Sequence, residues 1–183
     1  ELWNVLREPV AGELIIPRKL RRGHRVHVNP FAFDREGRQV RLSSNFVSFT
    51  RCVAVDKETG LDRATATFLI AAFLTSSFGQ LQFEVEGYNR EGMLALEKSH
   101  MKRIRVFDPR WIRPENRSRI IDAFQDLPYP VAADRLSHTQ HKRNRLDNLI
   151  AEEVCARSSH FQVSALLDEA HSALDEWLIA RQP

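Results

Sequence analysis

The sequence predicts an α+β fold, with a mixed α/β body followed by a helical tail. Residues 12–55 alternate in hydrophobicity with a period of two and are rich in β-branched and aromatic side chains, which is typical of strands. From residue 114 onward the apolar residues recur at spacings of three and four, which is typical of helices that bury one face. We expect the body to span residues 1–112 and the tail to span residues 113–183.

Three strand segments are expected at the start of the body. They span residues 12–20, 24–33 and 44–55, and residues 34–38 (DREGR) supply turn-forming side chains between the second and the third. In the second segment Val26 and the valine two positions later lie on one face of the strand.

A long, largely buried helix is expected next. Asp62 has the side chain of an N-cap, and the apolar pattern that begins near Arg63 continues at helical spacing through Leu81. Gly79 lies inside this pattern, where glycine costs about 1 kcal/mol relative to alanine. It therefore indicates a kink, a helix end or close packing at that point.

Short elements are expected in the rest of the body. Gly87 and Gly92 flank a polar segment with the character of an exposed loop. A strand at 94–96, a turn at 97–101 and a strand at 104–107, which a proline stops, complete the body.

The tail is expected to be entirely helical. Its helices are predicted over residues 114–127, 131–140, 143–156 and 162–180, and the second of them either stands alone or joins the third. Pro114 is suited to the first turn of the helix at 114–127, because the N–H groups of a first turn have no acceptor within the helix.

Length and cysteine content limit the class of protein. The 183 residues suffice for one ordinary domain with a sizeable core. No apolar run is long enough for a membrane span, so we expect a soluble, cytoplasmic protein that contacts no membrane. Cys52 and Cys155 lie far apart without nearby partners, which excludes a disulfide framework. Because Glu1 is not an initiator, we expect the chain to be part of a longer protein.

Charge is distributed unevenly along the chain. Residues 1–145 hold 25 Lys and Arg against 17 Asp and Glu, a net charge of +8, whereas residues 146–183 hold 2 against 7, a net charge of −5. A polyanionic partner is therefore expected to meet the body, and the acidic tail is better suited to packing on protein.

The first candidate binding cluster is the basic run at residues 17–25. It offers phosphate-binding and guanine-reading side chains without any acid. The alternative is a solvated basic loop. Its candidate nucleic-acid-binding residues are Arg18, Lys19, Arg21, Arg22, His24 and Arg25.

Two further clusters carry residue types that contact nucleic acids. Tyr88, Asn89 and Arg90 lie between two glycines and offer stacking and hydrogen bonding, although an ordinary surface turn has the same composition. In the second cluster the basic side chains alternate with apolar ones, which suits phosphate contact or an edge strand charged against aggregation. The cluster comprises Lys98, His100, Lys102, Arg103 and Arg105, followed by Arg110 and Arg113, and its candidate nucleic-acid-binding residues are Lys102, Arg103 and Arg105.

Enzyme motifs are mostly absent from the chain. It has no glycine-rich motif for S-adenosylmethionine, no nucleotide-binding P-loop and no metal-binding CxxC or HExxH pattern. Asn29-Pro30-Phe31 lacks the second proline of the motif with which adenine methyltransferases hold their target amino group. We therefore expect no catalytic residue, no metal and no cofactor in this chain.

A diffuse set of motifs resembles a known family. In order along the chain they are Ile16-Pro17-Arg18, Ser43-Ser44-Asn45-Phe46, the helix end at 74–80, Glu84, Gly92 and the segment 105–109. Their order and spacing are similar to the C-terminal target-recognition region of adenine-specific DNA methyltransferases from restriction–modification systems.

The resemblance implies a role in recognising double-stranded DNA. It places Arg18, Ser44 and Asn45 near the DNA and makes residues 74–84 part of the scaffold. It also implies an upstream catalytic domain that binds S-adenosylmethionine, flips the target base and transfers the methyl group. Three alternatives stay open: half of a type I restriction specificity subunit, a protein-interaction scaffold with incidental basic charge, and a small nuclease.

Overall fold

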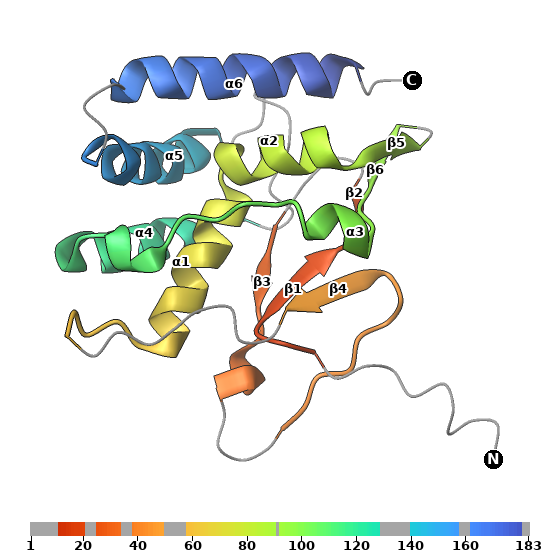
Figure 1. Ribbon diagram of the computed structural model, residues 1–183, viewed down its shortest axis with the longest axis horizontal. Helices are drawn as coiled ribbons and strands as arrows, with labels where there is room; N and C mark the ends of the chain where they lie inside the picture. Colours follow the sequence, from red (N-terminus) through yellow and green to blue (C-terminus); the bar gives the residue numbers. More distant parts are fainter. Residues whose placement is uncertain are drawn as a thin grey trace.

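The computed structural model describes residues 11–20, 25–33, 38–49, 58–90, 92–128, 140–157 and 162–180 (Figure 1). Within these ranges, two small antiparallel sheets are combined with helices, which confirms the α+β class. The strands are β1 (Leu14–Pro17), β2 (Lys19–Leu20), β3 (His27–Val28), β4 (Phe46–Phe49), β5 (Tyr88–Arg90) and β6 (Met93–Ala95). The α-helices are α1 (Arg63–Thr75), α2 (Ser77–Glu86), α3 (Lys98–Met101), α4 (Pro114–Gln125), α5 (Gln140–Cys155) and α6 (Val163–Ala180), and η2 (Pro30–Phe33) and η3 (Pro109–Trp111) are 3₁₀ helices.

Both sheets include a strand from the segment that spans residues 14–20. One has the strand order β3-β1-β4 and the other the order β2-β6-β5, with all pairs antiparallel. β1 faces the core through Leu14 and Ile16, which are 2% and 1% exposed. Only Arg18 separates β1 from β2, so the chain passes from one sheet into the other at this residue.

Helix α1 is the central helix of the core. Asp62 caps it as predicted, because its Oδ1 accepts a hydrogen bond from the N–H of Thr65 at 2.7 Å. Most of its side chains are buried, which agrees with the buried helix expected from the sequence. It packs against α4, and Figure 1 shows α4 lying beside it, away from the sheets.

The apolar pattern expected to run as one helix to Leu81 is broken at Ser76. α1 and α2 meet there at an angle of 65°. The N–H of Ser76 bonds back to the carbonyls of Ala72 and Phe73, and its hydroxyl donates to the Phe73 carbonyl at 2.6 Å. These bonds satisfy the last carbonyls of α1 and end it, whereas apolar spacing alone continues across the break.

A buried carboxylate fixes the start of α2. Asp147 of α5 accepts hydrogen bonds from the N–H of Ser77 at 2.9 Å and from its hydroxyl at 2.6 Å. The same carboxylate lies 3.0 Å from Nε2 of His171 on α6. Asp147 therefore joins α2, α5 and α6, and it lies at the positive end of the α2 dipole.

Gly79 is required by close packing. A Cβ atom at this position would lie 2.4 Å from the Cα and carbonyl oxygen of Leu74, which belongs to α1. Of the three interpretations that the sequence allowed, the structure therefore supports close packing at Gly79, and the kink lies three residues earlier at Ser76.

The tail covers one side of α1 and α2. Figure 1 shows α6 lying across α2 and α5, and it buries Ala170 and Leu174. The predicted Pro114 start of α4 is confirmed, as are the positions of α5 and α6. The helix expected at 131–140 lies outside the described residues except for Gln140. The predicted division at residue 112 stays a prediction, with α4 beyond it sharing the core with α1.

Several expected strands and loops have different structures. The strand expected over 24–33 is reduced to β3, because Asn29 Oδ1 accepts from the N–H of Phe31 and starts η2. The third predicted strand is described only as β4, and residues 50–57 lie outside the described ranges. The loop expected between Gly87 and Gly92 is strand β5 of a hairpin, and Gly92 has the positive φ of 73° that its turn requires.

Two more local predictions were wrong. The turn expected at 97–101 is the short helix α3, which a reciprocal capping box between Glu97 and His100 stabilises. The strand expected at 104–107 belongs to neither sheet. The side-chain amide of Gln82 bonds both the N–H and the carbonyl of Arg105, at 2.8 and 3.0 Å, and so replaces a strand partner.

Among the described residues no single helix is long and apolar enough to cross a membrane. α1 and α2 reach that length and composition only when taken together across their bend.

A second buried carboxylate, Glu153, anchors α5 to the start of α4. It accepts hydrogen bonds from the N–H and guanidinium of Arg113, the latter at 2.7 Å, and from the amide of Asn116 at 2.5 Å. Burial disfavours the charged form of Glu153, but the hydrogen bonds from Arg113 and Asn116 outweigh it and hold the pKa of this carboxyl below its usual value.

We expect Gly79→Ala to lower the free energy of unfolding by about 2 kcal/mol, because overpacking against the Leu74 backbone exceeds the gain in helix propensity. Urea denaturation measures this change. Gly60→Ala is the matched control: Gly60 has a φ of +67° but no atom within 4 Å of an added Cβ, so only backbone strain of about 1 kcal/mol is expected. A Gly79→Ala protein as stable as the wild type would contradict the packing described.

We expect the ion pair of Glu153 to make stability depend on pH in the acid range. Since its folded pKa lies below the unfolded value of about 4.3, its contribution is complete above that value and is lost as the pH falls through the folded pKa. Urea denaturation from pH 6 to pH 3 should therefore show a smaller loss of stability for Glu153→Gln than for the wild type. Glu152→Gln, at an exposed neighbouring position, should retain the wild-type dependence; parallel curves for all three proteins would refute the assignment.

Candidate nucleic-acid interface

Arg18 lies where the two sheets meet. Its N–H donates to the carbonyl of Asn45 at 2.8 Å, next to β4, and its carbonyl accepts from the N–H of Leu96 at 2.8 Å, next to β6. The backbone of this one residue therefore connects the edges of both sheets, and its side chain emerges at their junction.

A polar pocket of about 480 Å³ opens at this junction. It brings together five residues that the sequence placed in three separate segments, each predicted to contact nucleic acid. These five are Arg18, Lys19, Ser44, Asn45 and Tyr88, and the rest of the lining is Met93, Ala95 and Glu97. The convergence follows from antiparallel pairing, which sets β2 beside β6 and β6 beside β5.

The guanidinium of Arg18 is oriented by two acceptors. NH1 donates to the carbonyl of Ser44 at 3.2 Å, and NH2 forms an ion pair with Glu97. The Arg18 and Glu97 side chains are 32% and 44% exposed, so solvent and ligands reach both of them. Because arginine carries five N–H donors and two are used, donors remain for a ligand.

Glu97 and Tyr88 are held by the same short helix. Glu97 is the N-cap of α3, and its carboxylate accepts from the N–H of His100. The ring of Tyr88 meets the ring of His100 edge to face, with centroids 5.5 Å apart. Tyr88 is nevertheless 40% exposed, and part of its ring is therefore open to a stacking partner.

The other candidates near the pocket differ in their availability. Lys19 is exposed on β2, opposite Ala95. Asn89 uses its Oδ1 to accept from the N–H of Gly92 at 3.1 Å, which fixes the hairpin turn. Arg90 pairs through its backbone with Met93 in the hairpin.

Arg25 points to a different part of the molecule. Its guanidinium donates to the carbonyl of Leu127 at 2.6 Å and lies 5.1 Å from the ring centroid of Phe124, so the side chain packs on the end of α4. Burial lowers its pKa. Arg25 is therefore engaged in packing and does not line the pocket. Three other candidates in the same basic run, Arg21, Arg22 and His24, lie outside the described residues.

The third predicted cluster is exposed and lies apart from the lining of the pocket. Arg103 forms an ion pair with Glu86, and the backbone of Arg105 is held by Gln82, as described above. Lys102, Arg103 and Arg105 all expose their side chains. The charged edge strand that the sequence also allowed is excluded, because these residues form no strand.

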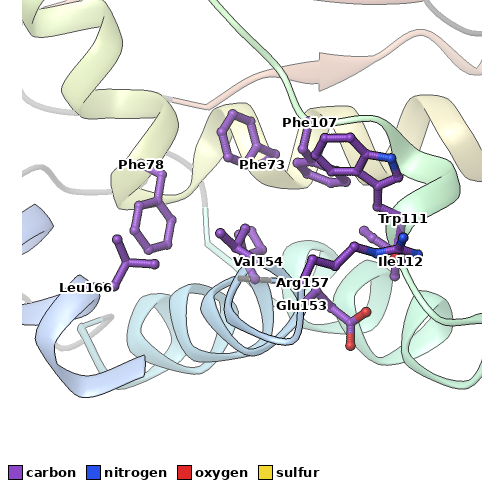
Figure 2. Close-up of a pocket in the computed structure, with 10 residues that line it drawn as sticks. Phe73, Phe78, Phe107, Trp111, Ile112, Glu153, Val154, Arg157 and Leu166 are labelled. Carbon is purple, nitrogen blue, oxygen red and sulfur yellow. Dashed lines mark hydrogen bonds between the residues drawn. The ribbon is translucent and has the colours of Figure 1, made fainter. Parts of the chain in front are cut away.

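A second, apolar pocket of about 620 Å³ lies between the α1–α2 bend, the segment before α4, α5 and α6. Figure 2 shows its aromatic lining, with Phe73 beside Phe107 and Trp111 next to Arg157. The carboxylate of Glu153 points away from these rings, toward the Arg113 and Asn116 contacts already described. Its lining is mostly apolar, and Arg157, its one basic residue, donates to the carbonyl of Trp111, so the pocket is less suited than the polar one to phosphates and base edges.

No metal site is formed by the part of the chain that the structure describes, where no three His, Cys, Asp or Glu residues gather closely enough to hold an ion.

Sequence reasoning missed Glu97 as a member of the polar pocket. A local signal was present, because Glu97 stands three residues before His100, the spacing of a reciprocal helix cap. Its pairing with Arg18, 79 residues away, has no signal in a single sequence.

Comparison with known protein families gives the following match. Residues 4–130 match the model of the family described as restriction endonuclease BpuSI, specificity domain. No curated protein and no solved structure matches the chain. The matched residues make up more than half of the chain and include every residue that lines the polar pocket. The chain therefore belongs to the family of the restriction endonuclease BpuSI specificity domain.

Proposed function

We propose that this chain is a target-recognition domain that binds double-stranded DNA in a sequence-specific manner. The observation that carries the proposal is its membership in a family of restriction endonuclease specificity domains. The polar pocket supports it, because side chains from three separate segments converge there with the chemistry that base edges and phosphates require.

Two residues of the pocket have distinct roles in this proposal. Arg18 is held by the Ser44 carbonyl and Glu97, and an arginine oriented in this way is suited to reading a base edge. Lys19 is an exposed point charge, which suits a phosphate contact. Asn45 and Ser44 add neutral hydrogen-bonding groups at the rim.

The parent protein is proposed to be a cytoplasmic restriction–modification enzyme in which an upstream domain carries the catalysis. The resemblance of this chain to the target-recognition region of adenine-specific methyltransferases favours S-adenosylmethionine as the cofactor of that upstream domain. Half of a type I specificity subunit is a less favoured parent. Its spacer helices are long, whereas α5 and α6 have 16 and 18 residues and reach only about 25 Å.

The proposal is tested by selecting bound sequences from a random-sequence duplex library across a salt series. We expect one short motif to be enriched at the higher salt concentrations, with affinity that falls steeply as salt rises. Binding without enrichment would contradict sequence recognition by this chain. No binding even at low salt would remove the nucleic-acid function and favour a protein-interaction scaffold.

Within that assay we expect Lys19→Ala to weaken binding to all duplexes about equally and to reduce the slope of log affinity against log salt by about one. The matched control is Arg145→Ala, because Arg145 is also an exposed basic residue and pairs with Asp126 at 3.3 Å, away from the pocket. A Lys19→Ala protein with a changed motif and an unchanged salt slope would instead make Lys19 a reader of bases.

A further inference from the structure

The polar pocket places hydrogen-bond donors beside acceptors. Two N–H groups of Arg18 are engaged, by Ser44 and Glu97, so three of its five remain for a ligand. A carboxylate has about four acceptor positions, of which Glu97 uses two, for Arg18 and for the N–H of His100. Both side chains are partly exposed, and an exposed ion pair contributes at most about 1 kcal/mol, so a ligand can compete with it.

The donors of Arg18 and the neighbouring acceptors of Glu97 complement the hydrogen-bonding groups on two edges of guanine. Guanine presents two acceptors, O6 and N7, next to two donor groups, N1–H and N2–H₂. An arginine fork bonds the acceptors, and a neighbouring carboxylate accepts from the donors. Adenine does not fit in the same way, because its N1 is an acceptor and would face the carboxylate of Glu97. In a duplex the N1–H of guanine is engaged by cytosine, so both edges are free only when the base is unpaired.

The shape and charge of the pocket favour a base over a phosphate. The pocket has a volume of about 480 Å³, and the Arg18 guanidinium is hydrogen-bonded to the carbonyl of Ser44, which lines it. An arginine held in this way is positioned to bond the edge of a base that enters the pocket. Tyr88 supplies an exposed aromatic ring on which an unstacked base packs. A phosphate entering the pocket would meet the negative charge of Glu97.

We propose that this pocket binds a single unpaired guanine, with Arg18 donating to O6 and N7, Glu97 accepting from N1–H and N2–H₂, and Tyr88 stacking on the ring. The inference rests on the proposed function, since DNA is the source of the base. It makes Glu97 a specificity-determining residue, because its carboxylate both orients Arg18 and selects the donor edge of guanine.

The test uses the full chain and single-stranded thymidine oligonucleotides that carry one central purine, so that no base pair competes. We expect the guanine oligonucleotide to bind about tenfold more tightly than the adenine one. Replacing guanine by 7-deazaguanine removes N7, and replacing it by hypoxanthine removes the N2 amino group, and each should cost several-fold in affinity. Fluorescence anisotropy of a labelled strand measures all four dissociation constants.

Three variants assign the contacts. Arg18→Lys keeps the charge but loses the fork, so it should lose the sensitivity to 7-deazaguanine. Glu97→Gln keeps the shape of the side chain and should lose most of the preference for guanine over hypoxanthine. Arg145→Ala should behave as the wild type, because its ion pair with Asp126 lies outside the pocket. Circular dichroism of each variant establishes that it is folded.

Several results would overturn the inference while leaving the proposed function intact. These are equal affinity for guanine and adenine, no binding to any single strand, or an Arg18→Lys protein that retains the full preference for guanine. Failure of the wild type to enrich any duplex motif is a separate result and would remove the proposed function itself. If the wild type and Glu97→Gln enrich the same duplex motif with the same preference for guanine, the domain reads paired bases only and the inference is overturned.

Discussion

The bend between α1 and α2 is the constraint on which the rest of the structure depends. α1 packs against α4 and the first sheet, whereas α2 packs against α6 and leads into the β5–β6 hairpin. The chain turns by 65° at Ser76, where the last carbonyls of α1 accept from the N–H of Ser76. Asp147 then accepts from the N–H of Ser77, at the start of α2. The Asp147 carboxylate is fully buried, so removing it would leave the N–H and hydroxyl of Ser77 without their acceptor.

The bend positions the pocket through a short series of contacts. α2 ends at Glu86, and its C-cap Gly87 has little room for a side chain, because an added Cβ would lie 2.8 Å from the carbonyl oxygen of Phe83 and 2.5 Å from the side chain of Leu94 of β6. β5 follows Gly87 directly and pairs with β6, and β6 pairs with β2 directly after Arg18. The orientation of α2 thus determines where Tyr88 and Glu97 lie relative to Arg18, although α2 itself contributes no residue to the pocket.

Some features that depend on local chemistry were predicted, although the capping box of α3 and the Asn29 turn before η2 were missed, and features that depend on distant partners were missed as well. The Asp62 cap and the Pro114 start need only neighbouring residues, and both were predicted. The break at Ser76 was missed because its stabilising acceptor, Asp147, lies some seventy residues further along the chain. At Arg105, likewise, a side-chain amide from α2 replaced the strand partner that hydrophobic alternation had implied.

The same distinction applies to the candidate site. Residue type and charge selected Arg18 and Tyr88, whereas their convergence follows from strand pairing and needed the structure.

The structure also separates two kinds of ion pair. Glu153, which is buried and bonded by Arg113 and Asn116, holds helices together and is strongly coupled to folding. The pair of Arg18 with Glu97 is exposed and contributes little to stability, and its donors and acceptor are therefore available to a ligand at low cost to the fold.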